Sequence, residues 1–203
     1  MAIQIKLSKT DNDLFCKSKW WGNPDVPDGF EFDDSLMFVC QIRCEDLVNY
    51  DDCNMLPHKG MLYFFCDIAY YLGYYVDFEP QSSSYWSKES VKVYYVEDVD
   101  ENSFRQIIFD DDYFPQIKER KIELEKTDDS VPGFKLLGTP YMFEYEKFPP
   151  PYTKYVNLLQ IDSEDDDDYN LMFMDMGLLY LIIHPKDLAR KDFSKVRGFL
   201  YST

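Results

Sequence analysis

Hydrophobic and polar positions follow the two-residue period of β-strands along much of the chain. Ile3, Ile5 and Leu7 are separated by polar residues, whereas residues 36–42 form an apolar run broken only by Gln41 and Met61–Cys66 is a continuous apolar run. Short runs of both kinds, bounded by glycine, proline or acidic residues, are typical of strands. Further runs rich in β-branched and aromatic residues lie at Val91–Val96 and Leu178–Ile183. The pattern predicts that most of the fold is sheet.

Helical patterns are few and short. The best candidates are residues 45–50, 67–75 and 185–191. The last of these has proline in its first turn and basic residues near its end, both favourable positions in a helix. The fold class predicted from these patterns is α+β, a mostly antiparallel sheet with short peripheral helices.

Three landmarks occur twice, in the same order and about 117 residues apart, which indicates an internal duplication. They are Gly22-Asn-Pro24 and Gly138-Thr-Pro140, the strand ends Gln41-Ile42 and Gln160-Ile161, and the strand starts after Gly60 and Gly177. One copy has too few strands to bury both faces of a sheet, whereas two copies related by a pseudo-twofold axis can share one core. We therefore expect a single domain over residues 1–203. Its repeats are predicted at about 19–66 and 135–183, with an insertion-like middle segment at about 80–130.

The landmark motifs also carry a family resemblance. Lys19-Trp-Trp-Gly22-Asn-Pro24, Leu56-Pro57-His-Lys-Gly60 and Gly177-Leu-Leu-Tyr180 together resemble the YwqG-like family of bacterial proteins, whose function is unknown. The resemblance covers most of the chain and implies a cytosolic α+β fold with an internal duplication. It supplies no catalytic residues. It also implies a role for some members as immunity or accessory proteins beside secreted toxins.

The composition is that of an acidic globular protein. Hydrophobic residues make up 45% of the chain, which excludes a disordered protein, and 38 acidic residues against 21 basic ones give a net charge of −17. Such a charge repels nucleic acid and anionic membranes, so neither is expected as a partner. It favours a basic protein partner, although a charge that only keeps the protein soluble is the plainer alternative. No apolar run could span a membrane and the start lacks signal-peptide features, so we expect a cytoplasmic protein.

Two candidate metal sites are weak. Cys40, Cys44, Cys53 and His58 lack the Cys-x-x-Cys spacing of zinc sites, and reduced, buried thiols are the better interpretation. The acidic run at residues 162–168 fails the EF-hand spacing, which favours a solvated loop between strands over a calcium site. The sequence therefore predicts no metal and no cofactor.

Catalytic patterns are also weak. The chain has only two histidines, His58 and His184, and it contains no nucleophile elbow, phosphate-binding loop or zinc-protease helix. His184 follows a predicted strand at the rim of the sheet, where a structural imidazole is the more common case. Gln41 and Gln160 end equivalent strands, so their amides either cap the neighbouring Gly-x-Pro turns or face a shared cleft.

The sequence favours a non-enzymatic protein-binding module with an acidic surface. Its most concrete form is an immunity protein that binds a basic partner such as a toxin; the alternative is an enzyme or small-ligand-binding protein with a cleft between the repeats. The candidate binding residues are Gln41, Gln160, His184, Asp165, Asp166, Asp167 and Asp168.

Overall fold

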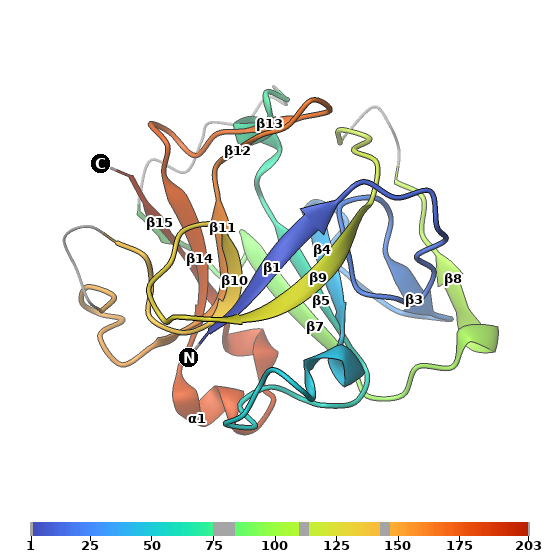
Figure 1. Ribbon diagram of the computed structural model, residues 1–203, viewed down its shortest axis with the longest axis horizontal. Coiled ribbons are helices and arrows are strands. Elements are labelled where there is room, and N and C mark those ends of the chain that lie inside the picture. Colours follow the sequence, from blue (N-terminus) through green and yellow to red (C-terminus); the bar gives the residue numbers. More distant parts are fainter. Residues whose placement is uncertain (1, 75–83, 110–113, 143–146, 203) are drawn as a thin grey trace.

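The computed structural model describes residues 2–74, 84–109, 114–142 and 147–202, and almost all of their regular structure is strand (Figure 1). Strands account for 38% of the structure and helical turns for 10%, so the predicted α+β class is wrong. The expected helices shrink to single turns: η1 (Cys44–Leu47), η2 (Ala69–Leu72) and α1 (Pro185–Leu188), which is the one α-helix among the described residues. Each turn buries only one or two side chains, too few to form a helical layer. The sheet forms the core instead.

Eleven strands of the described residues form one antiparallel sheet, in the order β6-β15-β14-β11-β10-β1-β9-β2-β4-β5-β7. Their bounds are β1 Ala2–Ser8, β2 Lys19–Trp20, β4 Met37–Arg43, β5 Met61–Cys66, β6 Tyr85–Trp86, β7 Val91–Val96, β9 Arg120–Thr127, β10 Phe134–Leu137, β11 Val156–Asp162, β14 Leu178–Ile183 and β15 Arg197–Tyr201. The sheet curls into a nearly closed, barrel-like shape (Figure 1). Two small ribbons lie beside it: β3 (Asp25–Pro27) pairs with β8 (Phe104–Gln106), and β12 (Glu164–Asp165) pairs with β13 (Asn170–Leu171). The remaining 3-10 turns are η3 (Glu101–Ser103) and η4 (Phe193–Lys195).

Apolar side chains cover both faces of the sheet. The main core fills its inner face, around Trp20 and Trp21. Two smaller clusters cover its outer face, one around Tyr63 and Phe65 and the other around Tyr180. Strands buried on both faces read as continuous apolar runs, which explains why Met61–Cys66 and Leu178–Ile183 show no alternation.

The strand order is symmetric about the central pair β1–β9. A first block (β2, β4, β5, β7) follows β9, and a second block (β10, β11, β14, β15) follows β1 on the other side. Both blocks shift register at matching places, between Phe38 and Cys40 in β4 and between Asn157 and Leu159 in β11. The match supports the proposal that residues 19–66 and 135–183 are copies of one unit. The middle segment supplies β7 and the central strand β9, so it is part of the same sheet.

Each block also contains the same buried polar row across three strands, which we call a Lys–Gln–Tyr rung. The rungs consist of Lys19, Gln41 and Tyr63 in the first block and of Lys135, Gln160 and Tyr180 in the second. All six residues are fully buried. Buried polar groups need hydrogen-bond or charge partners, so the rungs restrict how each block can pack.

The two buried lysines have different partners. The Nζ of Lys19 lies 2.8 Å from a carboxylate oxygen of Asp25. The Nζ of Lys135 instead donates to the carbonyl oxygens of Asp129 (2.6 Å) and Thr139 (2.7 Å). Carbonyl groups carry no full charge, and burial lowers the pKa of Lys135 to about 8.

We expect the stability of the wild type, relative to a Lys135→Met variant, to rise with pH between about 8 and 10.5. In this window the unfolded chain still binds the Lys135 proton while the folded chain loses it, so raising the pH favours folding. The rise should be about 1–2 kcal/mol, measured by urea unfolding across the window. Lys154→Met changes an exposed lysine and serves as the control. A difference that stays flat with pH would contradict a depressed pKa.

Candidate functional site

The acidic run forms a hairpin, in which β12 and β13 pair. Asp165 lies opposite Asn170, and the backbone N–H of Asp166 donates to the carbonyl oxygen of Tyr169 at 2.9 Å. The turn between the strands therefore consists of residues 166–169. We call residues 164–171 the acidic hairpin.

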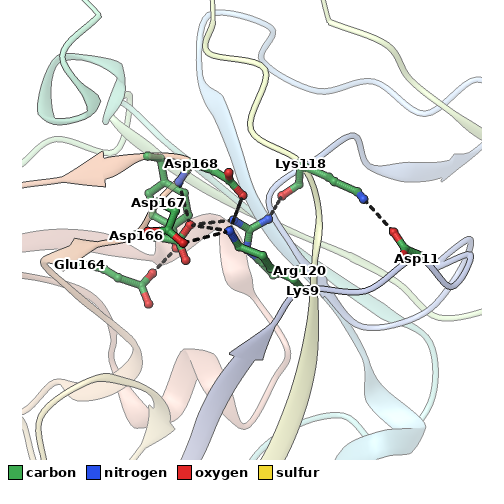
Figure 2. A network of polar contacts seen from close by, with 9 residues as sticks. Lys9, Asp11, Lys118, Arg120, Glu164, Asp166, Asp167 and Asp168 are labelled. Carbon is green, nitrogen blue, oxygen red and sulfur yellow. Dashed lines mark hydrogen bonds and ion pairs between the residues drawn. The ribbon is translucent and has the colours of Figure 1, made fainter.

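Two basic side chains hold this hairpin against the sheet (Figure 2). Arg120 is the first residue of β9, and its side chain is only 2% exposed. Its Nη2 lies 2.8 Å from a carboxylate oxygen of Asp166 and 2.5 Å from one of Asp168. The Nζ of Lys9 lies 3.1 Å from the same oxygen of Asp168. Charge-assisted hydrogen bonds to a buried guanidinium are among the stronger polar contacts, so the turn is fixed in place.

The anchored aspartates titrate at lower pH than ordinary ones. The pKa of Asp166 is lowered first by the backbone N–H of Asp168 and then by Arg120. The pKa of Asp168 is lowered by hydrogen bonds from Lys9 and Arg120. Asp165 is exposed, and the side chain of Asp167 is 96% exposed although Lys9 lies 3.7 Å away. The hairpin thus ties two carboxylates to Arg120, of which Asp168 is still 45% exposed, and leaves the other two in solvent.

The base of the hairpin rests on the main core. The Tyr169 hydroxyl donates to the Glu164 carboxylate, and its ring packs edge-on against Trp21 at 5.5 Å. The guanidinium carbon of Arg120 lies 5.8 Å from the centre of the same ring. Leu171 is fully buried in the core. These contacts fix the orientation of the hairpin.

Gln41 and Gln160 do not contribute to this hairpin. Their Oε1 atoms accept the backbone N–H groups of Asp25 (2.8 Å) and Tyr141 (3.1 Å), each of which follows the proline of a Gly-x-Pro turn. Their Nε2 groups donate to carbonyl oxygens of nearby segments: Gln41 to Lys17 (2.9 Å), and Gln160 to Gly133 (2.7 Å) and Val131 (3.1 Å). Both amides therefore cap the Gly-x-Pro turns, and neither faces a shared cleft.

His184 lies far from the acidic hairpin. Its Nδ1 accepts the backbone N–H of Lys186 at 3.2 Å, so the imidazole caps the first turn of α1. The ring also packs edge-on against Tyr155 at 5.7 Å. Figure 1 places α1 and the hairpin at opposite ends of the sheet, so the structure does not bring His184 together with the four aspartates.

The candidate zinc ligands are not gathered into one site. Cys40 and Cys44 are buried, Cys53 is exposed, and all five cysteines are free. Within the described residues, no three His, Cys, Asp or Glu side chains are arranged to hold a metal ion. A second acidic run in the sequence, Asp110-Asp111-Asp112, lies outside the described residues.

Sequence reasoning missed Arg120, because it lies in the middle segment that was expected to be insertion-like. A signal was present. Arg120, Ile122 and Leu124 occupy alternate positions, so the arginine lies on the apolar side of β9. A charged residue on the buried side of a strand requires a partner of opposite charge.

The comparisons identify a family but no activity. The model for a domain of unknown function (DUF1963) matches residues 18–200, and the chain belongs to this family. No curated protein matches the chain. Within the described residues, no helix has both the length and the apolar character needed to cross a membrane.

We predict that Gln41→Leu and Gln160→Leu each lower the free energy of unfolding by about 2–4 kcal/mol. Each change removes three hydrogen bonds and leaves buried backbone groups without partners. Urea unfolding measures the effect. Gln116→Leu alters an exposed glutamine and should change stability by less than about 0.5 kcal/mol. Unchanged stability in either buried variant would contradict the capping role.

Arg120→Met should lower the free energy of unfolding by about 1–3 kcal/mol at neutral pH, because Asp166 and Asp168 lose their buried cation but remain near water. Hydrogen exchange should accelerate at residues 166–169. Urea unfolding and exchange mass spectrometry measure the two effects.

The matched control is Lys121→Met, which changes the next residue of β9. Lys121 is exposed, so this change should leave hydrogen exchange in the hairpin unchanged.

The effect of Arg120→Met should also depend on pH. Because the pKa values of Asp166 and Asp168 are below the ordinary value of 3.8, their ion pairs stabilise the fold above about pH 3.8, and this contribution is lost as the pH falls further. The Arg120→Met deficit should therefore shrink below about pH 4. An equal deficit at pH 3 and 7 would argue against the ion pairs.

Proposed function

We propose that the chain is a protein-binding module and that its acidic hairpin attracts a basic protein partner. The observation that carries this proposal is the division of the four aspartates. Asp166 and Asp168 are tied to Arg120, while Asp165 and Asp167 are exposed. An ordered turn with outward carboxylates loses little conformational freedom on binding.

The charge of the whole chain supports the same proposal. A net charge of −17 produces a field that attracts cationic proteins over distances of about a Debye length, roughly 8–10 Å at physiological salt. Such a field acts mainly on the association rate, whereas close contacts determine how long a complex lasts. The hairpin supplies a defined position at which a steered partner can dock.

The resemblance to the YwqG-like family gives the narrower form of the proposal. It supports a cytoplasmic bacterial protein that binds a basic toxin as its immunity partner. The enzyme or small-ligand alternative has less support. Three open grooves of about 310–460 Å³ lie on the described part of the chain, and none of them is lined by Gln41, Gln160 or His184.

The double variant Asp165→Asn/Asp167→Asn should capture less of a basic partner from native cytosol, because it removes two outward charges and leaves the anchoring aspartates intact. For the purified complex, the association rate should fall about three- to tenfold at low salt, with a smaller change in the dissociation rate. Surface plasmon resonance at several salt concentrations measures both rates.

Glu31→Gln/Asp34→Asn is the matched control, because it removes two exposed charges from the loop between β3 and β4. It should slow association less than the hairpin variant. Equal effects of the two variants would assign the attraction to net charge alone. If a metabolite co-purifies with the chain and no protein partner is captured at any salt concentration, the proposal is wrong.

A further inference from the structure

Exposed apolar side chains gather beside the acidic hairpin. Of the seven exposed large apolar side chains among the described residues, four lie in or next to the segments that flank it: Tyr74 (42% exposed), Met172 (37%), Met174 (53%) and Met176 (75%). Three of the chain's eight methionines thus fall within five residues and remain in contact with water. Single exposed apolar residues are ordinary, but a local group marks an interaction surface.

A groove of about 460 Å³ lies within this group. We call it the Tyr–Met groove; it is lined by Tyr70, Tyr71, Leu72, Gly73, Asn170, Met172 and Met174. One wall is η2 of the first block, and the other is the chain at β13 of the second. The backbone N–H of Met172 donates to the carbonyl oxygen of Tyr71 at 2.9 Å, which holds the walls together. The groove therefore lies where the two halves of the chain meet.

The backbone places the methionines outward at a cost. Met174 and Met176 have φ values of +52° and +58°, in the left-handed region that residues other than glycine rarely adopt. Phe173, between Met172 and Met174, is fully buried and fixes the direction of its neighbours. The Gly177 N–H closes the turn by donating to the Phe173 carbonyl oxygen at 2.6 Å. This turn leaves Met174 and Met176 exposed.

The side chains of the groove suit one kind of occupant. Tyrosine and methionine are enriched in protein interfaces, and flexible thioethers adapt to large apolar or aromatic groups. Asn170, which lines the groove, is the cross-strand partner of Asp165 on the hairpin. Directly opposed residues in a ribbon have Cα atoms about 5 Å apart, so Asp165 lies beside the groove, and Asp167 lies two residues further along the hairpin turn.

We infer that the Tyr–Met groove binds an aromatic side chain of a basic protein segment whose neighbouring lysines or arginines pair with Asp165 and Asp167. This inference rests on the proposed function and adds the anchor that determines how long the complex lasts. An extended segment advances about 3.3 Å per residue, so a basic residue within two positions of the anchor can reach the hairpin. A buried aromatic anchor surrounded by charge pairs is a common form of binding hot spot.

The test uses the full chain labelled with ¹³C at its methionine methyl groups, and two lysine-rich pentapeptides with tryptophan or alanine at the centre. The tryptophan peptide should bind about tenfold more tightly and shift the Met172 and Met174 methyl signals. The alanine peptide should bind weakly through charge alone. Met172→Ser/Met174→Ser should remove the advantage of tryptophan, whereas Met176→Ser, outside the groove lining, should preserve it.

The outcomes separate the inference from the proposed function. Asp165→Asn/Asp167→Asn should weaken both peptides by a similar factor. If the two peptides bind equally and only the aspartate variant weakens them, the groove is not the anchor, although the acidic hairpin still binds basic segments. If the tryptophan peptide binds the aspartate variant as tightly as the wild type, the acidic hairpin is not the docking element. If neither peptide shifts the methyl signals at millimolar concentration, the inference is overturned.

Discussion

Two buried amides connect the sheet of this protein to the loops that cover it. Gln41 accepts the backbone N–H of Asp25, and the Tyr63 hydroxyl donates to the carbonyl oxygen of the same residue. In the second block, Gln160 and the hydroxyl of Tyr180 hold Tyr141 in the same way. In each block, both backbone groups of the residue after the Gly-x-Pro turn are therefore satisfied inside the protein. Because an unmade buried hydrogen bond is expensive, these contacts determine where each loop lies.

The position of these loops explains why the fold has so little helix. Each block needs apolar cover on the outer face of β5 or β14, where Tyr63 and Tyr180 lie. In many mixed folds a helix provides that cover. Here the loops after the Gly-x-Pro turns provide it, with aromatic side chains such as Phe30 and Phe148 packed at 5.3 and 5.4 Å from the two tyrosine rings. The short turns η1, η2 and α1 lie in the connections at the ends of the strands and do not cover a face of the sheet.

The sequence was sufficient for the features that local pattern controls. The apolar runs predicted Met61–Cys66, Val91–Val96 and Leu178–Ile183 with the bounds that the structure has. The repeated landmarks placed Gly60 and Gly177 directly before β5 and β14. Fold class was not predictable in this way, because short segments such as 45–50 satisfy a helical pattern without the length that a helical layer needs.

The site was less predictable, because its contacts join residues that are distant in sequence. Arg120 and Asp166 are 46 positions apart, and only the closing of the sheet brings them together. The acidic run by itself suggested four equivalent aspartates. Their division into anchors and outward carboxylates depends on which side of the turn meets β9. Gln41 and Gln160 were recognised as unusual, yet the sequence alone could not choose between capping and a shared cleft.

The two ends of the sheet have related connections but different surfaces. At one end, α1 and η4 fill the space beside β7: Phe193 packs against Tyr95 at 6.0 Å, and the Nζ of Lys191 lies 5.2 Å from the centre of the same ring. At the other end, η2 and β13 leave the Tyr–Met groove between them. The glutamine and tyrosine of each rung make matching hydrogen bonds in both blocks, which restricts change there. The connections carry no such requirement, so one of them can hold an acidic hairpin and exposed methionines without disturbing the sheet.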